Sequence, residues 1–410
     1  MNKTLVWQLA FRYLRGKRSG NAVPILSRIS MVAIGVASCA MIILFSVFNG
    51  FTHLVRDLYK SFYPEIKITA ARGKFFAPPA DAYNIITGTK GVAAYAHVLE
   101  DNVLVTSEED QRVATIKGID KAYFKVNNLK PHIIQGRDSV ISLPEATGIF
   151  GAQLLIDLGL DVENAFSSVM LYYPNAETDN MALNPTNAFQ SVRVRADGAF
   201  RVQEDFDDKY ILADMPVVQS LFNAPGKYSS IELSLEGGAD ADDVKKQLQE
   251  KLGNTYKVET RYEQNKTLYM VMRSEKWAIF AILLMVLLIA SFNMVGALSL
   301  LVMEKQKDMA ILKAMGAEGA TVRNIFMAEG ILWSLVGGVT GLVLGILICL
   351  GQQQFQWIKM QGSWIIEAYP VRLQPMDALL IIVTVVLVGL LASWYPALRA
   401  VKTEASLRSN

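Results

Sequence analysis

The sequence has little charge and almost no cysteine or histidine. Of its 410 residues, 19% are charged and 52% are hydrophobic, and the mean hydropathy is +0.26. Such a composition is too apolar for an ordinary soluble domain and indicates a membrane protein. Two cysteines and three scattered histidines exclude a disulfide scaffold and argue against a dedicated metal site.

Catalytic motifs are missing as well. The sequence contains no G-x-x-x-x-G-K-[ST] phosphate-binding loop, no G-x-S-x-G elbow and no H-E-x-x-H helix; these motifs mark nucleotide hydrolases, serine hydrolases and metalloproteases. We therefore expect no catalytic residue, no metal and no cofactor bound by this chain. Any ATP would be hydrolysed by a separate partner, and nothing predicts a nucleic-acid partner.

Four stretches without any charged residue are long enough to cross a hydrocarbon core of about 30 Å. They predict transmembrane helices at 29–50, 277–303, 330–350 and 378–398. The first stretch loosely matches a lipoprotein signal at Val36 to Cys39. A cleaved signal is rejected because apolar sequence continues beyond it and the basic segment before it is too long.

Charge is distributed unevenly around these helices. Residues 51–275 carry 24 Lys/Arg and 31 Asp/Glu, a net charge of −7, whereas the remainder of the chain carries +9. The positive-inside bias predicts cytoplasmic segments at 1–28, 304–329 and 399–410. Residues 51–276 and 351–377 are then expected outside the cytoplasm.

The long segment 51–276 is predicted to be a mixed α/β domain. Alternating apolar and polar residues indicate strands at 65–69, 102–106, 191–195 and 230–234, and helices are expected at 149–160 and 241–252. The fold class is thus an α-helical membrane protein with four transmembrane helices and a large mixed α/β extracytoplasmic domain inserted between the first and second helices.

A polar loop interrupts this domain between Pro174 and Pro185, with Asn175 and Asn184 just inside its ends. Polar turn residues of this kind indicate a protruding loop. A solvated connection without function and an exposed docking arm are both compatible with the pattern.

Small and polar residues mark contacts within the membrane. Gly337, Gly341 and Gly345 recur every four residues and predict a stripe for close helix packing. Of two asparagines in the spans, Asn49 is expected to be hydrated near the membrane surface. Asn293 is expected to bond to a neighbouring helix.

A short, charged segment follows the second predicted span and ends at Gly316. Its apolar residues fall on one stripe, which fits either a helix lying on the membrane surface or a helix that docks into a cytosolic partner. The segment contains Glu304, Lys305, Lys307, Met309, Ile311, Leu312, Lys313, Met315 and Gly316.

This segment resembles the coupling segment of the MacB/FtsX-like permeases, which are membrane subunits of ABC transporters. The resemblance implies that the nine residues named above couple the chain to a partner ATPase. The N-terminal sequences Ala10 to Arg15, Ser27 to Ser30 and Val47 to Phe51 are similar to the lipoprotein-releasing LolC/LolE branch. The tail from Ser393 to Ala400 is similar to the family's closing motif.

The resemblance implies a multi-pass protein of the bacterial inner membrane with both termini in the cytoplasm. Two permeases, identical or sibling, would join a dimer of a LolD-like ATPase that uses ATP and Mg. ATP-driven movement would lift acylated lipoproteins out of the membrane lipid and pass them to a LolA-like periplasmic carrier. The loop from Pro174 to Pro185 is the candidate docking arm for this carrier.

We expect the acyl chains to enter a cavity between the first two spans. Apolar bulk at helical spacing suggests that its lining is Met41, Phe45, Phe48, Trp277, Phe280 and Leu284, although ordinary lipid-facing packing accounts for each residue singly. Two other functions fit the same architecture. One is a permease that exports peptides or toxins or activates a cell-wall enzyme, and the other is a sensor or scaffold.

Overall fold

The computed structural model describes residues 7, 8, 10–12, 22–108, 110–140, 145–164, 166–175, 189–359 and 368–402. The chain divides into two compact units. Residues Val55–Tyr269 form the inserted domain, and the segments before and after it form the helical unit. Each unit has its own hydrophobic core.

Among the described residues, the helical unit is built from four long, largely apolar helices and one short, charged helix. Its elements are α2 (Ala22–Lys60), α10 (Lys266–Glu304), α11 (Gln306–Ala314), α12 (Gly319–Phe355) and α13 (Pro375–Lys402). Four of them, all except α11, are long and apolar enough to cross a membrane. At about 1.5 Å per residue, the 39 residues of α2 extend roughly 58 Å, so this helix continues well beyond a hydrocarbon core of about 30 Å.

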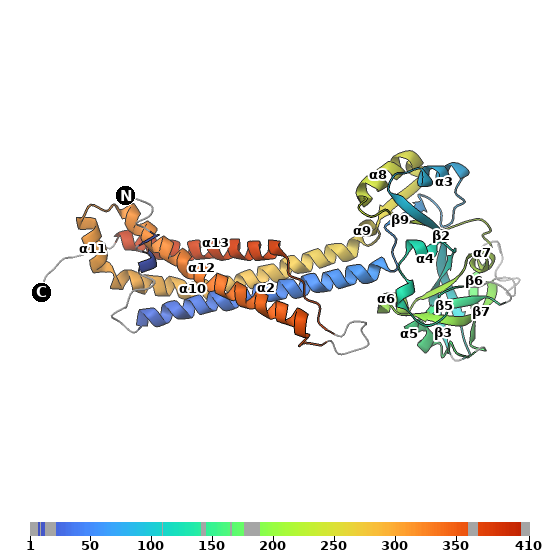
Figure 1. The fold of residues 1–410 in the computed structure, drawn as a ribbon, viewed down its shortest axis with the longest axis horizontal. Helices are drawn as coiled ribbons and strands as arrows, with labels where there is room; N and C mark the ends of the chain where they lie inside the picture. Colours follow the sequence, from blue (N-terminus) through green and yellow to red (C-terminus); the bar gives the residue numbers. More distant parts are fainter. Residues whose placement is uncertain are drawn as a thin grey trace. The chain divides into compact units, whose positions relative to one another are not determined.

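The inserted domain contains one sheet of ten strands (Figure 1). The strands are β1 (Ile66–Ala70), β2 (Val92–Thr106), β3 (Gln111–Ile119), β4 (Ile133–Gly136), β5 (Thr147–Gly151), β6 (Ser168–Pro174), β7 (Phe189–Phe200), β8 (Tyr210–Asp214), β9 (Ser230–Leu235) and β10 (Tyr256–Thr260). Their order is β10-β1-β9-β2-β3-β8-β5-β7-β4, and β6 pairs with β2 and β7.

Short helices connect the strands and cover the sheet. They are α3 (Ala80–Thr87), α4 (Tyr123–Val126), η1 (Lys130–His132), α5 (Ala152–Asp157), α6 (Glu204–Asp207), α7 (Met215–Leu221), α8 (Ala241–Leu252), η3 (Gly253–Thr255) and α9 (Arg261–Gln264). One core packs α5 and α7 against the central strands. A second packs α3 and α8, which lie together in Figure 1, against β1, β9 and β10.

The strands that lead to and from the membrane helices are neighbours. β1 follows α2, β10 precedes α9 and α10, and the two strands pair antiparallel from Ile66↔Thr260 to Ala70↔Tyr256. Arg261 closes this junction because its Nε donates to the carbonyl oxygen of Tyr63, at 2.8 Å. The chain therefore enters the inserted domain at β1 and leaves it at β10, two paired strands at one edge of the sheet.

The sequence-based elements agree with the structure in most places and differ in one. The expected helix at 241–252 coincides with α8, whose Val244 and Leu248 are buried as its spacing requires. The expected helix at 149–160 begins instead as strand β5 and becomes helical only at Ala152. Pairing explains the difference, because β5 is held between β7 and β8 by backbone hydrogen bonds.

Candidate functional site

The six residues expected to line a lipoprotein cavity lie on α2 and α10. Phe45 is 1% exposed, and its ring centre lies 6.1 Å from that of Phe280. Met41 is fully buried beside it in the same core, and Leu284 packs against that core from α10. In this structure the space between the two helices at Phe45 is therefore occupied by their own side chains.

Two of these residues reach the surface. Trp277 is 59% exposed and its ring meets that of Phe280 edge to face, with the ring centres 5.8 Å apart. Phe48 is half-buried. The exposed Trp277 and the partly buried Phe280 thus form an apolar surface on α10, close to where the chain leads into the inserted domain.

Next to these rings lies a group of three polar side chains that we call the polar triad: Asn49 of α2, Lys276 of α10 and Asp377 of α13. Lys276 Nζ donates to Asp377 Oδ1 at 2.9 Å and to Asn49 Oδ1 at 3.0 Å. Asn49 Nδ2 donates to Asp377 Oδ2 at 2.5 Å. Asn49 and Asp377 are 6% and 4% exposed, so the expectation that Asn49 is simply hydrated is wrong.

The triad also has a cation–π contact and a backbone support. Lys276 Nζ lies 5.4 Å from the centre of the Phe45 ring, within the range of a favourable contact. The amide N–H of Arg372 donates to the carbonyl oxygen of Ser46 at 2.8 Å. A Cβ at Gly50 would overlap the backbone of Pro370, so the glycine lets the segment before α13 approach α2.

The predicted coupling segment forms the end of α10 and the separate helix α11. Lys305, between the two helices, pairs with Asp308 at 3.4 Å. Lys313 Nζ donates to the carbonyl oxygen of Val401 in α13 at 3.2 Å. One end of α13 is therefore in contact with the coupling segment.

Helix α11 ends as its glycine predicts. Gly316 has a φ of +89°, and the N–H groups of Gly316 and Ala317 donate to the carbonyl oxygens of Lys313 and Leu312. This is the Schellman arrangement that ends helices at a glycine.

The apolar residues of the coupling segment divide into two sets. Met309 is buried against the helical unit, at 5% exposure. Ile311 and Met315 are 58% and 72% exposed, and Leu312 is half-buried. The exposed pair, rather than Met309, is the surface that a partner can reach. Glu304 is the last residue of α10, and Lys307 lies in the first turn of α11.

The predicted docking arm falls at the connection between β6 and β7. Pro174 ends β6, and its register partner in β7 is Phe189, so these two antiparallel strands form the base of the arm. Asn175 follows β6, whereas Asn184 and Pro185 lie outside the described residues.

The glycines of α12 bring other helices close. A Cβ at Gly337 would overlap the carbonyl oxygen of Met31, and one at Gly341 would overlap that of Gly35, so α12 packs on the backbone of α2. Gly345 lies against Ile42 of α2 in the same row. Gly338 instead faces Val385 of α13.

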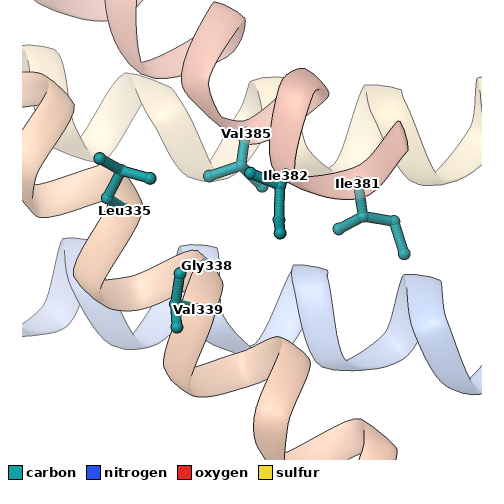
Figure 2. A pocket seen from close by; sticks show the side chains of 6 residues that line it. All are labelled: Leu335, Gly338, Val339, Ile381, Ile382 and Val385. Carbon is teal, nitrogen blue, oxygen red and sulfur yellow. The ribbon is translucent and has the colours of Figure 1, made fainter. Parts of the chain in front are cut away.

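Between α12 and α13 lies a small notch that is lined by apolar side chains (Figure 2). Its lining residues are Leu335, Gly338 and Val339 of α12 and Ile381, Ile382 and Val385 of α13. It contains no polar group that could bind or orient a substrate. We therefore interpret it as a packing feature.

Comparison with known families identifies the family of the chain. The model of the MacB-like periplasmic core domain matches residues 27–251, and that of the FtsX-like permease C-terminal region matches residues 280–405. The chain belongs to the MacB/FtsX-like permeases. Four candidate membrane helices with a mixed α/β domain between the first and second confirm the predicted fold class.

Individual relatives match this permease over nearly its whole length. It is 25% identical to the lipoprotein-releasing system transmembrane protein LolC of Xylella fastidiosa, covering 97% of this chain and 96% of that protein. It is 22% identical to the corresponding protein LolE of Haemophilus influenzae, covering 97% of each. These matches confirm the resemblance to the LolC/LolE branch.

Among solved structures, the periplasmic region of MacB from Actinobacillus actinomycetemcomitans is similar to the permease with 10% identity and a TM-score of 0.36. The match covers 53% of this chain and 98% of that one.

The inserted domain of this permease buries a charge network of its own, which no sequence pattern predicted. Lys117 of β3 pairs with Glu232 of β9 at 2.8 Å, and Lys67 of β1 pairs with Glu100 of β2 at 2.7 Å. Lys117 Nζ also lies 3.7 Å from Glu100 and 5.1 Å from the ring centre of Phe62.

This network favours the charged forms of Lys117 and Glu100. Burial alone would lower the pKa of Lys117, but the nearby Glu232 raises it well above its usual value. Burial likewise favours a higher pKa for Glu100, yet Lys67 and Lys117 lower it to about 2. The alternating charges tie together four neighbouring strands, β1, β9, β2 and β3.

Proposed function

We propose that this permease is the membrane subunit of an ATP-driven complex that releases lipoproteins from the bacterial inner membrane. The observation that carries the proposal is the similarity, over 97% of the chain, to proteins named as transmembrane components of the lipoprotein-releasing system. The permease match at residues 280–405 supports it by giving the chain the architecture of an ABC transporter subunit.

The proposed topology places both termini in the cytoplasm and the inserted domain in the periplasm. The basic flanks of the spans support this orientation. A separate, LolD-like ATPase dimer would hydrolyse ATP with Mg, because the chain lacks a phosphate-binding loop of its own. A second permease, identical or sibling, would complete the complex.

Lipoprotein release needs an apolar route. Burial of an acyl chain is worth about 0.8 kcal/mol per methylene, so three chains would cost on the order of 30 kcal/mol to place in water. The chains must therefore pass from lipid to protein to a LolA-like carrier without crossing solvent. The apolar surface of Trp277 and Phe280 is the proposed first contact, since Phe45 and Met41 behind it are already buried.

Photo-crosslinking tests this route directly. A photoreactive residue at Trp277, activated in cells, is expected to form adducts with acylated lipoproteins. The control is the same residue at Leu344 of α12, which is equally exposed at 58% and should crosslink to phospholipid. Adducts at position 277 with peptides, with a cell-wall enzyme or with phospholipid alone would reject lipoprotein release and favour the export or activation function.

The coupling role of α11 has its own test. Replacing the exposed Ile311 and Met315 by Asp is expected to abolish co-purification of the ATPase, because two charges would be placed in an apolar contact. Val113→Asp, which changes a side chain of similar exposure in the inserted domain, should leave co-purification intact. Undiminished ATPase binding by the α11 variant would contradict the coupling role.

We also propose that the arm between β6 and β7 binds the carrier. Its support is positional, because the strands on either side of it pair with each other as far as Pro174 and Phe189. Deleting residues 175–184 should remove carrier binding and leave ATP hydrolysis unchanged. Carrier binding by the deleted form would reject this assignment.

A further inference from the structure

The polar triad is not explained by any step of the proposed function. It joins α2, α10 and α13 at one point, and its members lie 227 and 101 residues apart along the chain. Lys276 and Asp377 form an ion pair whose side chains are 30% and 6% exposed. With little water present, such a pair is strengthened, and removal of one partner leaves a costly buried charge.

The same helix α13 is held at its other end by the coupling segment. Lys313 of α11 donates to the carbonyl oxygen of Val401. A Cβ at Gly319, the first residue of α12, would lie 2.9 Å from a methyl group of Val401, so this turn is also in close contact. Helix α13 thus links the coupling segment at one end to Asp377 at the other.

Helix α10 is less buried within the helical unit than its neighbours are. In its most apolar window, 22% of residues are buried, against 44% in each of α2 and α13. Glycine contacts bind α12 to α2 and to α13, whereas the glycine of α10, Gly296, has nothing within 4 Å of an added Cβ. Apolar side chains such as Leu287, Met294 and Leu298 attach α10 to the core, and the ion pair adds a directional contact near the start of this helix.

We propose that α13 acts as a strut that carries displacement of the coupling segment to Asp377, from which the polar triad passes it to α10 and α2. These are the two helices that continue into the inserted domain. Lys276, Asp377 and Asn49 are accordingly positioning residues, because they act on the inserted domain through helices. The inference rests on the proposed function for its source of movement, the partner ATPase.

The decisive variant removes the ion pair without leaving a buried charge. Lys276→Met combined with Asp377→Asn keeps the side-chain volumes close to the original, and such replacements of buried pairs are often neutral for stability. A purely structural role predicts that this double variant works normally. If α13 acts as a strut that needs this ion pair, the double variant should fold and bind the ATPase. It should then transmit little ATP-driven movement to the inserted domain.

The matched control makes the same two changes in an exposed pair. Lys60 and Asp57 lie 2.8 Å apart with side chains 47% and 44% exposed. Lys60→Met with Asp57→Asn should behave as the unchanged protein, because exposed pairs contribute little. The single variant Lys276→Arg keeps the charge, so it should retain most of the ATP-dependent response that the double variant loses.

The readout is independent of cargo. The complex with its ATPase is placed in lipid vesicles, with a fluorescent donor at the exposed Val113 of the inserted domain and acceptor lipids in the bilayer. ATP should change energy transfer in the unchanged protein. In the triad double variant the change should fall by about fivefold or more, with ATP hydrolysis within about twofold of normal.

Each outcome is decisive for the strut. A full ATP-dependent change in the double variant overturns it, as does an unchanged protein that shows no change with ATP. A parallel loss of ATP hydrolysis also overturns it, since the triad would then act in folding or ATPase docking. Lipoprotein release is measured separately in the same vesicles. A normal ATP-dependent change without release would reject the proposed function and leave the strut intact.

Discussion

The inserted domain and the helical unit both bury charged groups, but they connect them differently. In the inserted domain, Glu100 has two lysine neighbours, and Lys117 has two glutamates and an aromatic ring. In the helical unit, Lys276 has Asp377, the neutral Asn49 and the ring of Phe45, and Asp377 has Lys276 and Asn49. The network connects four neighbouring strands, β1, β9, β2 and β3, through several charged contacts. The triad connects three helices, α2, α10 and α13, at a single point. Charged contacts are therefore spread across the sheet in the inserted domain and concentrated at one point in the helical unit.

The two units also differ in how their elements pack. Large aliphatic and aromatic side chains fill the cores of the inserted domain, where exclusion of water drives association. The helical unit brings α2 and α12 together at Gly337 and Gly341, backbone against backbone. Lipid supplies no comparable drive, so close van der Waals contact has to hold membrane helices together.

The largest effect is expected from breaking the charge network. Lys117→Met leaves Glu232, which is 0% exposed, without its cation, and the loss of one partner of a buried pair costs about 3–5 kcal/mol. Hydrogen exchange of β3 and β9 amides in the full chain should report this loss. The double variant Lys117→Met with Glu232→Gln should recover much of the lost stability. Lys60→Met, which changes an exposed lysine, should leave the hydrogen exchange of these amides unchanged. Equal losses in the single and double variants would contradict a network held by this pair.

A smaller effect is expected from separating α2 and α12. Gly341→Ala places a methyl group on the carbonyl oxygen of Gly35, and overpacking of this kind costs about 1–3 kcal/mol. The melting temperature of the purified chain in detergent is the measurement. Gly296→Ala is the matched control, because open space surrounds that position and alanine is the better helix former. If the control were as destabilising as Gly341→Ala, close backbone contact would not explain the stability of the helical unit.

Much of the fold can be predicted from local sequence because its signals are local. Charge-free stretches locate the four membrane helices, and the alternation in Ile66 and Ile68 locates a strand whose buried side faces a core. The segment starting at Ile149 fails this approach. Its strand β5 is fixed by partners in β7 and β8, and short apolar runs do not by themselves distinguish strand from helix.

The polar triad and the charge network could not be predicted for a related reason. Lys276 and Asp377 each lie one residue outside a charge-free stretch, so a hydropathy argument assigns them to the boundary and expects water around them. Their partners are more than 100 residues away.

The apolar stripe of α11 could be predicted from the sequence. Which of its residues are buried could not, because the burial of Met309 and the exposure of Ile311 depend on the neighbouring helices.

The smallest expected effect is the change of stability with pH, to which two carboxyl groups of the inserted domain contribute with opposite sign. Burial raises the pKa of Asp207 to about 6, although the N–H of Val202 donates to its Oδ1 at 2.8 Å. A folded-state pKa above the ordinary 3.8 gives stability that is complete below about 3.8 and is lost as the pH rises through about 6. Glu100 has the opposite sign, because its pKa falls from 4.5 to about 2, and its contribution is lost as the pH falls through that range.

The inserted domain should therefore be most stable in mildly acid solution, between the two titrations. Hydrogen exchange of β8 amides, followed from pH 7.5 downward and corrected for the intrinsic exchange rate, should first slow and then, below about pH 4.5, accelerate. Asp207→Asn keeps the acceptor for Val202 but cannot ionise, so it should remove the slowing and leave the acid limb unchanged. If slowing persisted in this variant, another group would be responsible, and the contrast between a buried carboxyl with and without lysine neighbours would have to be abandoned.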